Sequence, residues 1–121
     1  MEAKDLMIGD WVYNHRNWEC PIVEIHKDSA VVIARHYGEE EFLLSDLRPI
    51  PLTPEILEKN GFVRNETWAE WVHYCDNIFI DFTILENETS FHLDLPNAMI
   101  DYVHELQHAL RLCGIDKEIE L

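Results

Sequence analysis

The stretch Asn97–Gly114, NAMIDYVHELQHALRLCG, decides how the second half of this chain folds. At about 100° per residue, Leu106 lies at the centre of one apolar helix face. The other members of that face are Met99, Tyr102, Val103, Ala109, Leu110 and Cys113. Pro96 and Asn97 favour a helix start, and Gly114 is typical of a left-handed C-terminal cap. The stretch therefore predicts one amphipathic helix over residues 98–113, packed on a core.

The same stretch contains the motif H-E-x-x-H at His104, Glu105 and His108. In zinc peptidases this spacing puts two histidine ligands on one helix face, with the glutamate as general base. Here both histidines lie about 160° from Leu106 on the helical wheel, so we expect them to face solvent. A catalytic zinc also needs a third protein ligand, and arginine and glycine occupy positions 111 and 114, where the extended motif has glycine and histidine. We therefore expect no catalytic residue, no metal and no cofactor. A weak two-histidine surface metal site and a zinc peptidase are the alternatives.

The formal net charge of −15 is unevenly distributed along the chain. Residues 65–110 contain nine Asp or Glu and no Lys or Arg, whereas residues 1–64 contain twelve acidic and seven basic residues. Such a field repels phosphate backbones, so we expect no nucleic-acid binding. It favours a protein partner with a basic surface.

Hydropathy and cysteine content indicate the compartment. No run of about 18 apolar residues is present, so we expect no membrane span. The three cysteines, Cys20, Cys75 and Cys113, form no spaced pair, and the N-terminus has no hydrophobic signal segment. This pattern indicates reduced thiols in the cytoplasm.

The first half of the chain reads as short strands. Strands are expected over residues 6–13, 20–26, 30–37 and 41–44, followed by an extended segment over residues 48–52 with two prolines. Five short strands in about fifty residues suggest a small SH3-like β-barrel over residues 1–52. Such barrels bind ligands through aromatic side chains, and the candidate binding residues here are Trp11, Tyr13, Trp18 and Tyr37. The alternative is that these rings only cover the barrel core.

Residues 53–121 are expected to form an α-β-β-β-α subdomain. Thr53 and Pro54 predict the start of a linking helix, and Asn60-Gly61 predicts its end. Three antiparallel strands are expected over residues 67–74, 78–85 and 91–95, with an edge strand over residues 117–121. The predicted fold class is thus α+β: an SH3-like barrel, a linking helix, then a three-stranded sheet packed by the long C-terminal helix.

Two segments carry a resemblance: PIPLTPEILEKNGF at residues 49–62 and YVHELQHALRLCGI at residues 102–115. Together with the opening IGDWV at residues 8–12, they resemble a family of small uncharacterised proteins from bacterial genomes and their phages or mobile elements. The resemblance spans most of the chain in the same order. It implies a shared fold and a mobile-element origin, and it implies no activity.

These observations favour a non-enzymatic protein-interaction module. The alternatives are an acidic decoy of a mobile element, which mimics nucleic acid, and the zinc peptidase. A phosphate-like row formed by Asp76, Asp81, Glu86, Glu88 and Asp94 would favour the decoy. A third ligand within reach of His104 and His108 would favour the peptidase.

Overall fold

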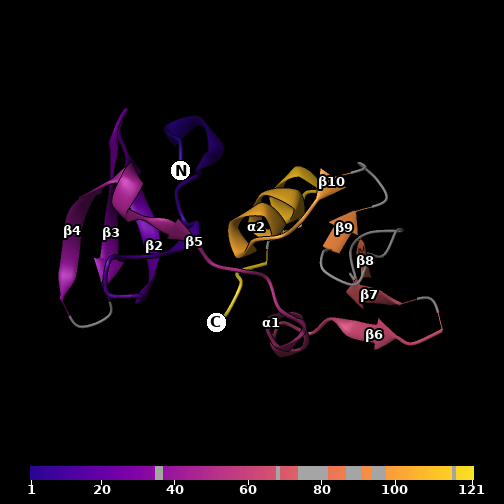
Figure 1. Cartoon of the computed structure of the whole chain (residues 1–121). Helices are drawn as coiled ribbons and strands as arrows, with labels where there is room; N and C mark the ends of the chain where they lie inside the picture. Colours follow the sequence, from indigo (N-terminus) through magenta and orange to yellow (C-terminus); the bar gives the residue numbers. More distant parts are fainter. Residues whose placement is uncertain (35–36, 68, 74–81, 87–90, 94–97, 116) are drawn as a thin grey trace. The chain divides into compact units, whose positions relative to one another are not determined.

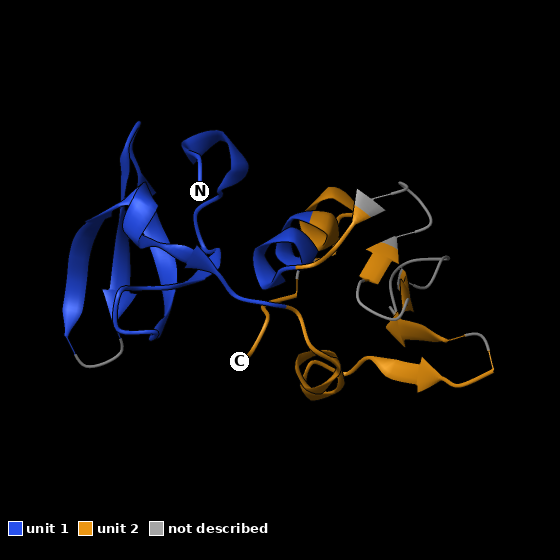
Figure 2. Cartoon of the chain, in the orientation of Figure 1, with its two compact units in different colours: residues 1–51, 102–108 blue, residues 52–101, 109–121 orange. Residues whose placement is uncertain are grey.

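A computed structural model describes residues 1–34, 37–67, 69–73, 82–86, 91–93, 98–115 and 117–121. It is an α+β protein with two antiparallel five-stranded sheets and one long helix (Figure 1). The chain divides into two compact units, which are coloured separately in Figure 2. Unit 1 contains residues 1–51 and 102–108, and unit 2 contains residues 52–101 and 109–121. No helix in the described ranges is long and apolar enough to cross a bilayer.

Unit 1 contains an antiparallel sheet of strand order β4-β3-β2-β1-β5. Its strands are β1 (Trp11–Tyr13), β2 (Glu19–Ile25), β3 (Ser29–Ala34), β4 (Gly38–Leu43) and β5 (Arg48–Pro49). The 3-10 helices η1 (Ala3–Asp5) and η2 (Leu44–Asp46) precede β1 and β5. Because β4 and β5 end the sheet at opposite edges, the described sheet is open, and the closed SH3-like barrel predicted for residues 1–52 is not seen.

The core of unit 1 follows the alternation expected of a half-buried sheet. Ala30, Val32 and Ala34 of β3 are buried and Ile33, on the other side, is 37% exposed, while Val31 departs from this alternation at 9% exposed. The rest of this core comes from β1, β2 and the two 3-10 helix regions: Leu6, Val12, Cys20, Ile22, Leu44 and Leu47. Burial raises the pKa of the Cys20 thiol, and the nearby Glu19 and Glu40 carboxylates raise it further. Cys20 therefore behaves as a small core side chain.

Unit 2 begins with helix α1 (Pro54–Lys59), and its predicted end signals are confirmed. The Thr53 hydroxyl oxygen accepts a hydrogen bond from the Ile56 amide at 3.3 Å, and Pro54 occupies the first helical position. Gly61 has a φ of 85°, and the amide of Phe62 donates to the Leu57 carbonyl at 3.0 Å. This is the left-handed helix end that Asn-Gly favours.

The sheet of unit 2 has more strands than the three that were predicted. Its order is β10-β9-β8-β7-β6, all antiparallel. The strands are β6 (Val63–Asn65), β7 (Glu70–His73), β8 (Phe82–Glu86), β9 (Phe91–Leu93) and β10 (Ala98–Met99). The strands β6 and β10 were missed because two or three residues carry no measurable periodicity. The first half of the strand predicted over residues 78–85 lies outside the described residues.

The C-terminal residues 117–121 form no strand, contrary to the prediction. They are held instead by the buried side chain of Asn60 at the end of α1. Its amide nitrogen donates to the Glu120 carbonyl at 2.8 Å, and its oxygen accepts from the Glu120 amide at 2.7 Å. One side-chain amide thus satisfies both backbone groups of Glu120, which replaces the ladder that an edge strand would need.

Helix α2 (Val103–Leu112) is shorter than the predicted helix over residues 98–113. Ala98 and Met99 pair with β9 instead, and Met99 is 52% exposed. The predicted C-terminal cap is confirmed, since Gly114 has a φ of 73° and the Ile115 amide donates to the Leu110 carbonyl at 2.9 Å. Cys113 follows the helix and is exposed, so its predicted place in the core is wrong.

Candidate functional site

The H-E-x-x-H glutamate caps the helix that carries it. The Glu105 Oε1 atom accepts a hydrogen bond from the Tyr102 amide at 3.1 Å, and the Tyr102 carbonyl accepts from the Leu106 amide at 3.3 Å. With Tyr102 as the N-cap, Glu105 is the third helical residue, which is the position from which a glutamate completes a capping box. Helix α2 therefore begins here, and Glu105 already has a structural role.

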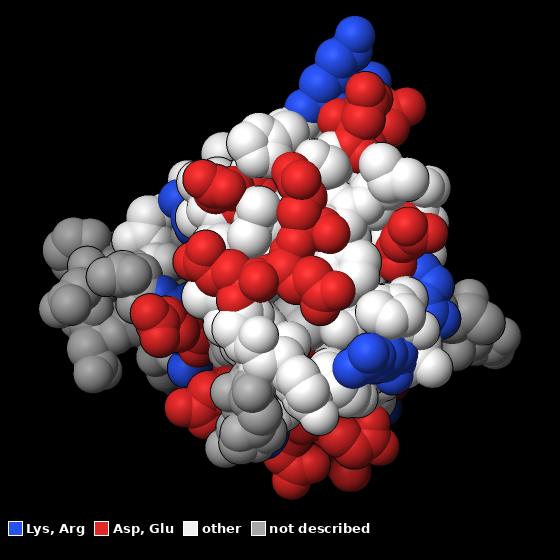
Figure 3. Space-filling model, turned by 90° about the vertical axis from the view of Figure 1, so that its left-hand side faces the viewer, with Lys and Arg blue, Asp and Glu red and all other residues white. Residues whose placement is uncertain are grey.

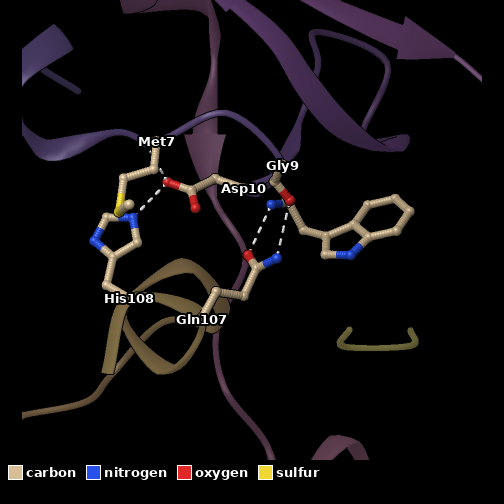
Figure 4. A network of polar contacts seen from close by, with 6 residues as sticks. Met7, Gly9, Asp10, Gln107 and His108 are labelled. Atoms are coloured by element: carbon tan, nitrogen blue, oxygen red, sulfur yellow. Dashed lines mark hydrogen bonds and ion pairs between the residues drawn. The ribbon is translucent and has the colours of Figure 1, made fainter. Parts of the chain in front are cut away.

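The two residues that end the motif hold the segment Gly9-Asp10-Trp11 (Figure 4). The Gln107 side chain accepts from the Trp11 amide at 2.9 Å and donates to the Gly9 carbonyl at 2.9 Å. The His108 Nε2 atom lies 2.6 Å from the Asp10 Oδ2 atom. Asp10 is fully buried and also accepts from the Met7 amide at 2.8 Å. We call these contacts the Asp10 network.

The Asp10 network was not predicted from the sequence. Asp10 and Gln107 are polar residues in segments that read as a strand and a helix, and their contacts join residues 98 positions apart. The available signal was that polar side chains interrupt otherwise apolar segments, as in the opening IGDWV. Buried polar groups need partners, so such an interruption predicts a hydrogen bond without identifying its partner.

His104 is buried and His108 only partly exposed, which corrects the solvent-facing orientation predicted for both. His104 is 8% exposed, and the His108 side chain is 24% exposed. The His104 ring stacks on Tyr102 at 5.9 Å between centroids and meets His108 edge to face at 5.6 Å. The wheel failed because it placed only the apolar face of α2 against a core, whereas the opposite side also packs against residues of unit 1.

Burial also decides the protonation of His104. Burial lowers the pKa of its imidazole, the neighbouring His108 lowers it further, and the carboxylates of Asp10, Glu105 and Asp5 oppose this shift. Its Nδ1 atom is buried with no hydrogen-bond partner, which is consistent with an uncharged ring. His104 is therefore a neutral, packed side chain near neutral pH.

We expect His104 to make stability depend on pH. Its pKa is about 6.5 when unfolded and lower when folded, so the unfolded state binds more protons below about pH 6.5. Stability should therefore fall as the pH is lowered from about 7.5 to about 5.5, and His104→Asn should flatten that fall. Urea unfolding at the two pH values measures the difference. The exposed His15 provides the control, and a slope changed equally by His15→Asn would contradict the assignment.

A cavity of about 480 Å³ lies beside the two histidines in unit 1. It is lined by Met1, Lys4, Asp5, Pro49, Tyr102, His104, Glu105 and His108. These side chains offer no serine, threonine or cysteine nucleophile. Within the described residues, no three His, Cys, Asp or Glu side chains are placed to hold a metal ion. Glu105, Gln107 and His108 thus each make a structural contact, and the described residues place no third ligand beside His104 and His108.

The structure separates the four aromatic residues that were predicted to bind a ligand. Trp18 and Tyr37 are stacked, with ring centroids 4.9 Å apart, and the Arg16 guanidinium lies over both rings. Tyr13 is instead covered by Arg48, whose guanidinium carbon lies 5.7 Å from the ring centroid. Trp11 is half-buried beside Asp10. Only Trp18 and Tyr37 therefore form a pair, which we call the aromatic pair.

Acidic side chains gather on one face of the unit 1 sheet (Figure 3). Glu41 pairs with Val31, which in turn pairs with Glu24, and Glu39 pairs with Ile33. Directly paired residues project on the same side of a sheet, opposite to the buried Ala30, Val32 and Ala34. We call Glu24, Glu39 and Glu41 the acidic face. Figure 3 shows acidic side chains over the middle of the view from this side, with most of the Lys and Arg near its margins.

Of the acidic residues proposed to form a phosphate-like row, only Glu86 lies among the described residues. Its carboxylate accepts from the Trp71 Nε1 atom at 2.7 Å and from the Arg64 Nε atom at 3.1 Å. These two hydrogen bonds, with the Trp71 bond the stronger influence, lower the pKa of Glu86. Asp76, Asp81, Glu88 and Asp94 lie outside the described residues. Glu86 is thus a paired carboxylate within its own sheet.

No protein-family model matches this chain, and neither a curated protein nor a solved structure gives a significant match. The resemblance to small bacterial and phage proteins therefore stays a prediction. In the structure, each of the three segments that carry this resemblance contributes to a buried polar contact. The opening IGDWV and the segment YVHELQHALRLCGI contribute opposite halves of the Asp10 network, and PIPLTPEILEKNGF supplies Asn60.

Proposed function

We propose that this protein is a non-enzymatic, cytoplasmic interaction module that binds an extended basic segment of a partner protein along β4. The observation that carries this proposal is that β4 ends its sheet. It pairs with β3 over all six residues, from Gly38 opposite Ala34 to Leu43 opposite Ser29, and its other edge has no partner strand in the described part of the chain. An open edge is the surface to which an extended segment adds as a further strand.

The negative charge on β4 favours a basic segment as the added strand. Glu39, Glu40 and Glu41 are consecutive and exposed, so a second acidic edge would be repelled. Glu39 and Glu41 lie on one side of the strand, two residues apart. A partner with Lys or Arg at alternate positions would place its cations opposite them. The same charges protect the free protein from pairing edge to edge with its own copies.

Exposed apolar and aromatic side chains border the acidic face. Leu43 is 58% exposed at one end of β4, and Tyr37 is 66% exposed immediately before its other end. The His15 ring packs 5.2 Å from Phe42, so the loop that carries Trp18 also borders this strand. The proposed segment would thus meet carboxylates along β4 and aromatic rings beside Gly38.

We further propose that unit 1 is SH3-like in its topology. Three observations support this proposal. The strands β2, β3 and β4 form a meander, β5 returns to pair with β1, and a 3-10 helix, η2, directly precedes β5. Small barrels of this kind bind peptides through aromatic side chains on their loops.

Glu39→Lys combined with Glu41→Lys should abolish binding of a basic strand. A fluorescent ten-residue peptide that alternates arginine and threonine serves as the probe, and its fluorescence anisotropy measures the affinity. We expect binding in the micromolar range that weakens with added salt, because charge complementarity supplies most of it. The control is Glu58→Lys with Glu66→Lys, which changes the net charge equally at exposed positions of unit 2.

Two results would contradict the proposal. If the control weakens binding as much as the β4 variant, the peptide responds to net charge and not to β4. If the peptide fails to bind while the protein strips DNA from a DNA-binding protein, the acidic decoy is favoured. That alternative is supported by the lack of Lys and Arg over residues 65–110.

A further inference from the structure

The aromatic pair of unit 1 is already covered by a cation from its own chain. The Arg16 guanidinium carbon lies 5.0 Å from the Trp18 ring centroid and 5.9 Å from the Tyr37 centroid. The two rings are nearly parallel, with an angle of 26° between their planes. Both distances fall within the range of about 6 Å in which a ring attracts a cation. The arrangement is therefore a cation site with an internal occupant.

The loop backbone, and not the Arg16 side chain, is what the fold holds in place. The buried Asn14 side chain accepts from the Arg16 amide at 2.9 Å and from the Trp18 amide at 3.0 Å. The Asn14 amide donates to the Trp18 carbonyl at 3.0 Å, and Asn17 has a left-handed φ of 62°. This tight turn returns the chain so that Arg16 faces Trp18.

The Arg16 side chain itself is held only loosely. Arg16 is exposed, and it forms no ion pair with any carboxylate in the described part of the protein. Tyr37 is 66% exposed, so water reaches its ring. Swinging the guanidinium away would cost its contacts with the two rings and would leave the Asn14 hydrogen bonds intact. The rings can thus exchange one cation for another without unfolding the loop.

We propose that the aromatic pair is a recognition site for one guanidinium or ammonium group of the basic partner segment, and that Arg16 occupies this site in the free protein. The inference rests on the proposed function, because the site adjoins the Gly38 end of β4. A partner must displace Arg16 to bind, so Arg16 is autoinhibitory. A partner with several cations also makes favourable contacts with the acidic face. An isolated cation only replaces the contacts that Arg16 made with the two rings. The contact therefore favours segments that carry charge along the whole of β4.

Removing the internal cation tests this proposal. Arg16→Gln should tighten binding of the alternating arginine-threonine peptide about two- to fivefold, as expected for one exposed cation–ring contact. Lys27→Gln is the control, since it removes one exposed positive charge from the same unit and no contact with the aromatic pair. When Tyr37→Leu is added to the Arg16→Gln variant, the peptide should bind more weakly, because the substitution removes the exposed ring of the aromatic pair. Equal affinities of Arg16→Gln and Lys27→Gln, or weaker binding by Arg16→Gln, would overturn the inference.

A second measurement separates this inference from the proposed function. If the wild-type protein and the Arg16→Gln variant both fail to bind the peptide, the proposed function is wrong. The site is then tested by titrating the Arg16→Gln variant with N-acetylarginine amide and following the NMR signal of the Trp18 indole N–H. A saturable shift that Tyr37→Leu abolishes supports the cation site. An indole signal that does not move, or that moves equally in the Tyr37→Leu background, overturns it.

Discussion

Leu106→Ala is expected to lower the free energy of unfolding by about 2–5 kcal/mol, the range for large-to-small changes in a packed core. Leu106 is fully buried and lies in the middle of α2 (Val103–Leu112). Truncation would remove apolar contacts and leave a cavity that the surrounding helix and strands fill only in part. Urea unfolding, followed by far-UV circular dichroism and by tryptophan fluorescence, measures the loss.

The matched control lies on the same helix. Leu112 is 82% exposed, so Leu112→Ala removes the same atoms without opening a cavity. It should change the free energy of unfolding by no more than about 0.5 kcal/mol. If Leu106→Ala and Leu112→Ala gave equal losses, the burial assigned to α2 would be wrong. The two spectroscopic probes must also report the same midpoint for a single free energy to be defined, because the chain has two units.

Elements whose signals are local were predictable from the sequence. Helix α1 has its N-cap, its first-turn proline and its left-handed end within ten residues, and each forms its expected hydrogen bond or dihedral angle. The strands β2 and β3 likewise start within one residue of the positions predicted for them, residues 20 and 30. These signals need no knowledge of distant residues, which is why they could be read directly.

Elements that depend on distant partners were not predictable. Residues 98–99 were predicted as the first turn of a helix, but they form β10 and pair with β9, with Met99 opposite His92. Residues 117–121 alternate like a strand, but the Asn60 side chain pairs with the backbone N–H and C=O of Glu120 instead. In each case tertiary hydrogen bonds override a local preference. A single sequence does not identify those partners.

The predicted orientation of the two histidines in the H-E-x-x-H motif was wrong for a related reason. Helical periodicity marks only apolar residues, so it placed His104 and His108 on the face opposite Leu106 and predicted that they face solvent. In the structure, Gln107 and His104 are also buried, at 7% and 8% exposed. Part of the α2 surface outside the apolar face is therefore buried as well, and Gln107 and His108 make polar contacts there with the segment Gly9-Asp10-Trp11. A buried polar face and a solvated one have the same sequence pattern, and only the positions of the partners distinguish them.

His108→Ala is expected to cost about 3 kcal/mol of stability, although an exposed histidine would cost no more than about 0.5 kcal/mol. The reason is that Asp10 is fully buried and its Oδ2 atom lies 2.6 Å from the His108 Nε2 atom. Removing the imidazole leaves a buried carboxylate with one fewer partner, and this penalty is larger than the value of the contact itself. Chemical unfolding near neutral pH measures the loss, and the exposed His15→Ala provides the control.

A double-mutant cycle separates this contact from general damage to the fold. Asp10→Asn keeps an acceptor for the Met7 amide but removes the charge that faces His108. If the two residues act as a pair, the combined variant should cost at least about 1 kcal/mol less than the sum of the single losses. Additive losses would show that His108 contributes through packing alone, and a loss near zero for His108→Ala would restore the solvent-facing histidine that the wheel predicted. Non-additive losses would show that His108 of the H-E-x-x-H motif stabilises the fold as the polar partner of the buried Asp10 carboxylate.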